Sequence, residues 1–124
     1  MKKVMLFGMV GLAILLFQVS VAPANKSEAS IEGPTDAVKG SEVTLRITAT
    51  HNANTPSHYT EWLKVTANQK EVARWDFKKE NLPEGAVFTK EIKIKVTEDT
   101  EIVADASCNN HGSKGPAKYK IRVK

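Results

Sequence analysis

The sequence is poor in the residues on which several protein classes depend. A single cysteine among 124 residues excludes an internal disulfide framework, and it excludes zinc sites built from four cysteines or from two cysteines and two histidines. Seven glycines and five prolines are too few for a collagen-like or proline-rich chain. The net charge of +4 is scattered rather than gathered in a long basic run, so we expect no nucleic-acid partner.

The first 24 residues have the pattern of a secretory signal peptide. Two lysines at positions 2 and 3 precede an unbroken stretch of apolar residues and glycines over Val4–Phe17, and Ala22-Pro23-Ala24 supplies the small residues that a signal peptidase recognises. We therefore predict cleavage after Ala24 and an exported, periplasmic location. The alternative is an uncleaved anchor, because the wider apolar stretch approaches the roughly 20 residues of a membrane-spanning helix. A membrane contact is expected only in that case.

Cleavage after Ala24 divides the chain into three parts. These are a signal peptide over 1–24, a polar lead-in over 25–39 that contains Gly33-Pro34, and one domain over 40–124. We predict an irregular conformation for most of the lead-in. The lone Cys108 would then face an oxidising compartment, where a free thiol is easily oxidised, so metal ligation or intermolecular pairing is expected for it.

Alternating apolar and polar residues dominate the domain. In 43–50, for example, Val43, Leu45 and Ile47 alternate with threonine and arginine, which is the period of a half-buried strand. Similar patterns predict strands over 59–67, 71–77, 87–96, 100–107 and 118–124, with a turn at Asn68-Gln69. No helical period is present, so we predict an all-β, immunoglobulin-like antiparallel β-sandwich of about seven strands. Trp62 and Trp75 are expected in its core.

All three histidines and the cysteine fall in loops or at strand ends. They are His51, His58 and His111, with Cys108 three residues before the last of them. Imidazole and thiolate are good ligands for first-row transition metals, and a Cys-x-x-His spacing lets one tight loop present two of them. Zinc would accept this set. Blue copper would leave one histidine over and would lack its axial methionine, since all three methionines lie within residues 1–24. Non-haem iron uses every ligand.

Two motifs give this set a family resemblance. The segments His58–Leu63 (HYTEWL) and Cys108–Gly112 (CNNHG) resemble the two ligand motifs of the desulfoferrodoxin and neelaredoxin family, the superoxide reductases, with similarity over about residues 40–113. The resemblance implies an immunoglobulin-like sandwich holding one mononuclear non-haem iron (Fe²⁺/Fe³⁺). His51, His58 and His111 would be equatorial ligands and Cys108 the axial, catalytic thiolate. It also implies superoxide as the substrate, hydrogen peroxide as the product and an external electron donor.

The chain departs from the family pattern in several places. The family supplies a fourth histidine from an upstream Glu-Lys-His-x-Pro segment, whereas no histidine precedes His51 here. Glu32 or Ser30 stands in the corresponding region, and a water ligand is a further option. The lysine that the family places beside the open iron position has no counterpart, although Lys26 and Lys39 lie nearby in sequence. His51 is the least secure ligand, because six residues separate it from His58 where the family has five.

Three functions therefore remain as hypotheses. The first is an exported superoxide reductase-like oxidoreductase. The second is an iron- or copper-binding electron carrier that keeps the scaffold without the catalysis, which the missing histidine and lysine favour. The third is an immunoglobulin-like interaction module or sulfur carrier, in which Cys108 would be mobile and exposed. The sequence leaves a homo-oligomer open.

Overall fold

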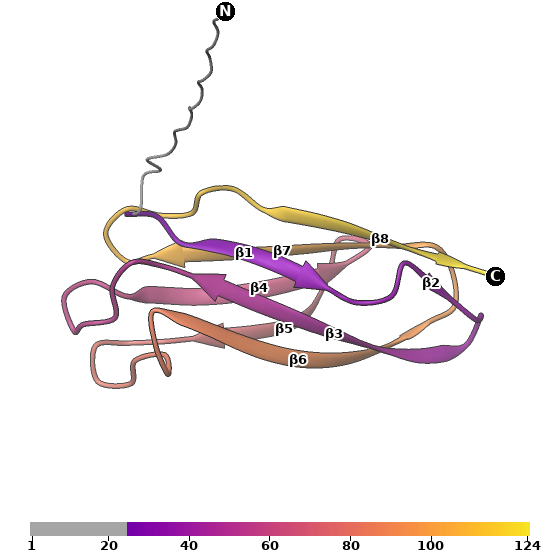
Figure 1. The fold of residues 1–124 in the computed structure, drawn as a ribbon, viewed down its shortest axis with the longest axis horizontal. Coiled ribbons are helices and arrows are strands. Elements are labelled where there is room, and N and C mark those ends of the chain that lie inside the picture. Colours follow the sequence, from indigo (N-terminus) through magenta and orange to yellow (C-terminus); the bar gives the residue numbers. More distant parts are fainter. Residues whose placement is uncertain (1–24) are drawn as a thin grey trace, which may run out of the picture.

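The computed structural model describes residues 25–124, and the predicted signal peptide lies outside them. Two β-sheets face each other (Figure 1). The smaller sheet has the order β1 (Glu28–Glu32), β3 (Ser41–Thr50) and β6 (Val87–Val96). The larger has the order β2 (Asp36–Ala37), β8 (Ala117–Val123), β7 (Thr100–Cys108), β4 (Thr60–Ala67) and β5 (Lys70–Asp76). The predicted all-β sandwich is confirmed.

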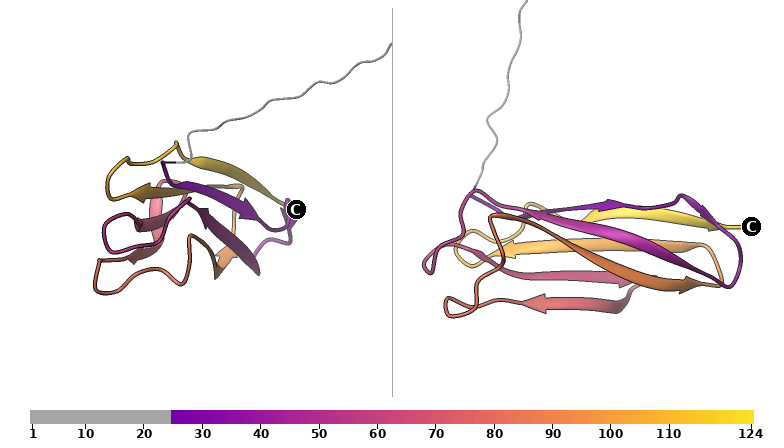
Figure 2. Two further views of the ribbon diagram at one scale, coloured as in Figure 1. Left: turned by 60° about the vertical axis from the view of Figure 1, so that its left-hand side comes forward. Right: turned by 60° about the horizontal axis from the view of Figure 1, so that its bottom comes forward.

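Every strand pair is antiparallel except the short β2–β8 pair, which is parallel. Figure 2 shows the two sheets stacked as layers along most of the length of the molecule. In the described part of the chain, no helix is long and apolar enough to cross a membrane.

The core lies between the sheets and follows the alternation in the sequence. Leu45 and Ile47 of β3 face Leu63 and Val65 of β4, all with no exposed surface. Ile102, Ala104 and Ala106 of β7 and Ile121 of β8 complete the buried layer. Because side chains alternate across a strand, the polar residues between these positions point to solvent.

The predicted turn at Asn68-Gln69 joins β4 to β5. Both residues have positive φ, at 48° and 72°, as a two-residue type I′ hairpin turn requires. The Asn68 side chain supports the turn, since its Oδ1 accepts the Glu101 N–H at 2.8 Å and its Nδ2 donates to the Asp99 carbonyl at 3.2 Å.

Two local predictions are wrong. Residues Glu28–Glu32 are not irregular but form β1, which pairs with β3 from Glu28 opposite Thr50 to Glu32 opposite Arg46. Tertiary pairing decides this segment, because its alternation is limited to Ala29 and Ile31. Trp62 is not in the core either: it is half-buried and does not pack against the core cluster, whereas its neighbour Leu63 is fully buried, so the indole lies on the outer face of the sheet.

On this outer face, the Lys64 Nζ lies 5.2 Å and the Arg74 Cζ 5.6 Å from the ring centroid of Trp62, which is a cation–π arrangement. Trp75, by contrast, packs against the core as predicted.

Three strand ends meet at one end of the sandwich, on the left in Figure 1. There β3 ends at Thr50, β4 begins at Thr60 and β7 ends at Cys108. Thr60 pairs with Cys108 in the ladder, so the loop after β3 and the loop after β7 lie side by side.

Candidate metal centre

The loop after β7 is a tight turn that closes on itself. The Cys108 N–H donates to the Gly112 carbonyl at 2.9 Å, and the Gly112 N–H donates back to the Cys108 carbonyl at 3.0 Å. Gly112 has φ +79°, a left-handed conformation that glycine adopts at little cost. This turn brings the Cys108 Sγ within 3.8 Å of the His111 Nδ1.

The loop between β3 and β4 carries the other two histidines. His51 follows β3 directly, and its N–H donates to the Ala86 carbonyl at 2.9 Å. Thr55 and His58 exchange main-chain hydrogen bonds at 2.9 and 3.0 Å, which folds the loop back just before β4. The imidazole rings of His51 and His58 meet edge to face with their centroids 4.5 Å apart.

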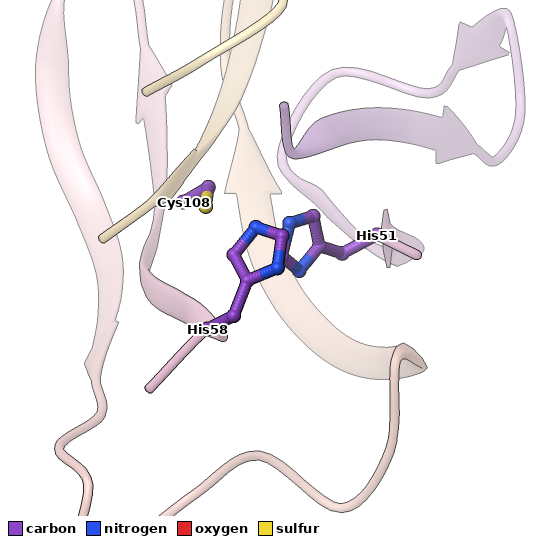
Figure 3. A group of neighbouring side chains, drawn as sticks. All are labelled: His51, His58 and Cys108. Carbon is purple, nitrogen blue, oxygen red and sulfur yellow. The ribbon is translucent and has the colours of Figure 1, made fainter. Parts of the chain in front are cut away.

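Three of the four predicted side chains form one compact group, and the fourth contacts two of its members. One ligand atom from each of His51, His58 and Cys108 lies within 4.8 Å of the others, and Figure 3 shows the two rings beside the cysteine sulfur. His111 lies at the edge of this group: its Nδ1 is 3.2 Å from the His58 Nε2 and 3.8 Å from the Cys108 Sγ. The structure therefore brings together all four predicted residues from two loops, while their role as ligands stays a prediction.

Burial differs sharply across the group. Cys108 is 1% exposed and His51 is 5% exposed, whereas His58 is half-buried and His111 is exposed. The sulfur therefore lies on the protein side of the cluster, and His111 marks its solvent side.

Asparagine side chains tie the two loops together. The Asn109 Oδ1 accepts the Tyr59 N–H at 3.0 Å, and the Nδ2 atoms of Asn109 and Asn110 donate to the Ser57 carbonyl at 3.3 and 2.8 Å. These bonds hold the chain on both sides of His58, at Ser57 and at Tyr59. The main-chain N–H of Asn110 also points at the Cys108 Sγ at 3.4 Å, as outer-sphere donors do in metal sites.

The two residues considered for a fourth ligand, Glu32 and Ser30, do not reach the cluster. Glu32 lies at the far end of β1, where its Oε1 is 3.7 Å from the Arg46 Nε. Ser30 pairs with Thr48 in mid-strand, and its side chain is exposed on the outer face of the sheet. Lys39 lies at the opposite end of the sandwich, where its N–H donates to the Lys124 carbonyl.

The main chain of Asn25 contacts His51, and the sequence did not predict this contact. Its main-chain carbonyl oxygen lies 3.1 Å from the His51 Nε2, while the His51 Nδ1 lies 2.9 Å from the Ala53 carbonyl oxygen. A main-chain atom leaves no signal in a residue pattern. Ser27, two residues on, is fully buried and bonds to the Cys108–Gly112 turn.

The donor set fits a transition metal. Three imidazoles and one thiolate combine borderline and soft ligands that iron, zinc and copper accept, whereas calcium and magnesium prefer oxygen. The Asn110 N–H beside the sulfur and the Ala53 carbonyl beside the His51 Nδ1 are hydrogen-bond partners of the kind that orient metal ligands.

Comparisons with known proteins identify a matching family and several similar solved structures. The family model described as desulfoferrodoxin matches residues 22–114. A solved superoxide reductase (neelaredoxin) from Ignicoccus hospitalis is 19% identical with a TM-score of 0.67, covering 80% of this chain and 82% of its own.

A putative superoxide reductase from Thermotoga maritima is 27% identical with a TM-score of 0.57, covering 78% and 86%. The sulfur carrier protein SoxY from Chlorobium limicola f thiosulfatophilum shares the fold at 13% identity and a TM-score of 0.57, covering 77% and 78%. No curated protein matches the chain.

Proposed function

The chain belongs to the desulfoferrodoxin family, and from this we propose that it is an exported superoxide reductase that uses one electron to reduce superoxide to hydrogen peroxide. The proposed centre is a mononuclear iron held by His51, His58 and His111 with Cys108 as the fourth protein ligand. The observation that carries the proposal is the convergence of these four side chains at one end of the sandwich.

Bound ferrous iron would supply the electron and a coordination position for a small oxygen anion. The chain's own residues do the rest. Cys108 would bind the iron as a thiolate from the buried side of the cluster, where a low-dielectric surrounding strengthens the interaction of a negative sulfur with a cation. The Asn110 N–H at 3.4 Å from the sulfur draws charge from it and holds the thiolate in place.

Access to the centre is one-sided. His111 is exposed while Cys108 and His51 are buried, so a small diffusing substrate arrives beside His58 and His111. The sandwich closes off the sulfur side from water. An external donor that returns the electron meets the same exposed face.

The sulfur-carrier hypothesis has less support. A carrier thiol must reach its enzymes on a mobile exposed segment, but Cys108 ends a paired strand, is 1% exposed and lies 3.8 Å from the His111 Nδ1. The likeness to the sulfur carrier protein is one of fold alone. The electron-carrier hypothesis is favoured by the absence of any histidine before His51, and turnover measurements separate it from the enzyme.

The test combines metal analysis, the absorption spectrum of the oxidised protein and stopped-flow mixing of the reduced protein with superoxide. We expect iron, a long-wavelength thiolate-to-iron charge-transfer band and superoxide consumption. Cys108→Ser should abolish the band and slow turnover, because a hydroxyl is a neutral ligand. Ser107→Ala, at a buried neighbour on the same strand, is the matched control and should keep both.

Two results would count against the proposal. A protein that takes up only zinc is not a superoxide reductase. If Cys108→Ser keeps its colour and its full turnover, the sulfur is not a ligand. A reversible iron couple without superoxide consumption would instead identify an electron carrier.

Export is part of the same proposal and is supported by the pattern over residues 1–24. We expect the protein in the periplasmic fraction of its cell, with Asn25 as the first residue on N-terminal sequencing. Retention of residues 1–24 with the membrane fraction would support the anchor alternative.

A further inference from the structure

Ser27 is a polar residue in a position where serine is seldom found. It is fully buried, and its Oγ lies 2.7 Å from the Oγ1 of Thr60, which is itself only 2% exposed. One hydroxyl donates and the other accepts, so each satisfies its neighbour. A buried hydroxyl that loses its partner costs more free energy than the bond contributes. The two side chains therefore depend on each other.

The main chain of Ser27 is bonded to the loop after β7. Its N–H donates to the Gly112 carbonyl at 3.2 Å, and its carbonyl accepts the Lys114 N–H at 2.8 Å. The same Gly112 carbonyl accepts the Cys108 N–H at 2.9 Å, so one oxygen joins Ser27 to the residue that carries the thiol. Figure 1 shows this start of the described chain, in indigo, beside the loop after β7.

The side chain of Ser27 is bonded to the other loop of the cluster. Thr60 is the first residue of β4, two residues after His58, and it pairs with Cys108 in the ladder. A shift of Thr60 therefore moves His58 relative to the sulfur. Ser27 thus joins the start of β4 to the Cys108–Gly112 turn from the buried side.

The other side-chain bonds between the two loops lie nearer to water. The amide groups of Asn109 and Asn110 donate to the Ser57 carbonyl at exposed positions, where water competes for the same donors and acceptors. Ser27 and Thr60 are shielded from that competition. Their bond is therefore the one whose loss the two loops can least easily replace.

Resting on the proposed function, we propose that Ser27 is a positioning residue of the metal centre. Its hydroxyl bond to Thr60 fixes the place of His58 relative to Cys108, and through them the geometry at the metal. Ser27→Ala leaves the Thr60 hydroxyl buried without its partner. Opening this junction to water relieves that cost, and it separates the start of β4 from the Cys108–Gly112 turn.

The test uses Co²⁺ as the probe, with its affinity measured by chelator competition and its coordination by ligand-field absorption. We expect Ser27→Ala to bind about tenfold more weakly, at the lower end of losses for groups that support metal ligands, with shifted ligand-field bands. The Tm of its metal-free form should fall by about 4–8 °C. Thr60→Val leaves the Ser27 hydroxyl unpaired and should reproduce all three effects, so it carries the test if Ser27→Ala fails to fold.

A rescue and a matched control make the comparison specific. Ser27→Ala combined with Thr60→Val removes both hydroxyls and leaves neither unpaired, so most of the affinity and the parent spectrum should return. Thr100→Val removes a buried hydroxyl at the opposite end of β7, where its Oγ1 donates to the Glu98 carbonyl at 2.8 Å. It should lower the Tm but keep the affinity and the spectrum.

Three results would overturn the role of Ser27. The first is a Ser27→Ala protein that keeps the parent affinity and spectrum despite a lower Tm, since the residue then serves stability alone. The second is an equal loss of affinity in Thr100→Val, which would trace the effect to global stability. The third is a double variant that regains neither affinity nor spectrum, because the hydroxyl pair is then not the cause.

These outcomes are distinguishable from failure of the proposed function. If the parent protein binds the metal with a sulfur charge-transfer band that Cys108→Ser removes, any of the three results overturns the role of Ser27 and leaves the metal centre intact. If the parent protein does not bind Co²⁺, the metal centre itself is overturned, and this inference with it.

Discussion

Gly112 offers a sharp test of how the fold shapes the candidate centre. Its φ is +79°, and a Cβ added there would meet no heavy atom within 4 Å. Gly112→Ala therefore introduces backbone strain without a steric clash. The residue also closes the Cys108–Gly112 turn through two main-chain hydrogen bonds, so the strain falls on the segment that carries two of the proposed ligands.

The size of the effect follows from two opposing terms. A non-glycine residue in the left-handed region costs about 1–2 kcal/mol, while alanine gains back about 0.4–1 kcal/mol by restricting the unfolded chain. The net loss of unfolding free energy is about 1 kcal/mol, or roughly 4–8 °C in Tm for a domain of this size. If the turn relieves its strain by opening, metal affinity falls by up to about tenfold.

Gly40 provides the matched control. Its φ is +85°, and it too has no heavy atom within 4 Å of an added Cβ. It lies before β3 at the end of the sandwich away from the cluster, where its N–H donates to the Val96 carbonyl. Gly40→Ala should lose the same unfolding free energy in a denaturant titration but keep the metal affinity.

Two results would refute this reasoning. If Gly112→Ala is as stable as the parent protein, the left-handed backbone is not a constraint at that position. If both variants lose metal affinity equally, the loss reflects global stability and not the turn around Cys108.

Three further substitutions address other parts of the molecule. His111→Ala should weaken Co²⁺ binding by at least about tenfold in chelator competition while keeping the sulfur charge-transfer band, because Cys108 is untouched; loss of that band would contradict this. Asn110→Ala removes the 2.8 Å bond to the Ser57 carbonyl but keeps the main-chain N–H at the sulfur, so urea titration should show a loss of about 1 kcal/mol, with the band unshifted. Leu45→Ala, at a fully buried core position, should cost about 2–5 kcal/mol of unfolding free energy, and a loss under 1 kcal/mol would mean that the two sheets repack.

Most of the sandwich was predictable because its signal is local. Alternation in segments such as 43–50 reflects the geometry of a single strand with one buried face, and the strands found there agree with it within one or two residues at most ends. The segment Glu28–Glu32 was not predicted as a strand, because only Ala29 and Ile31 carry the alternating pattern. What makes it a strand is its ladder with β3, which no short window reveals.

The candidate centre was likewise predictable only in part. The residue types and the Cys-x-x-His spacing predicted which side chains meet. The pattern did not exclude Glu32, because its distance from His51 depends on the register of β1 against β3. It also had no means of finding the Asn25 carbonyl, since every residue carries one.

By itself, the sequence determined the all-β class, the turn at Asn68-Gln69 and the chemical character of the four donors, because these depend on side-chain type and on periods of a few residues. The tertiary structure decided that the loop after β3 lies against the loop after β7, that Cys108 is buried while His111 is exposed, and that Asn25 reaches His51. Those features arise from the pairing of strands far apart in the chain, whose registers are set by the burial of whole faces and not by any local pattern.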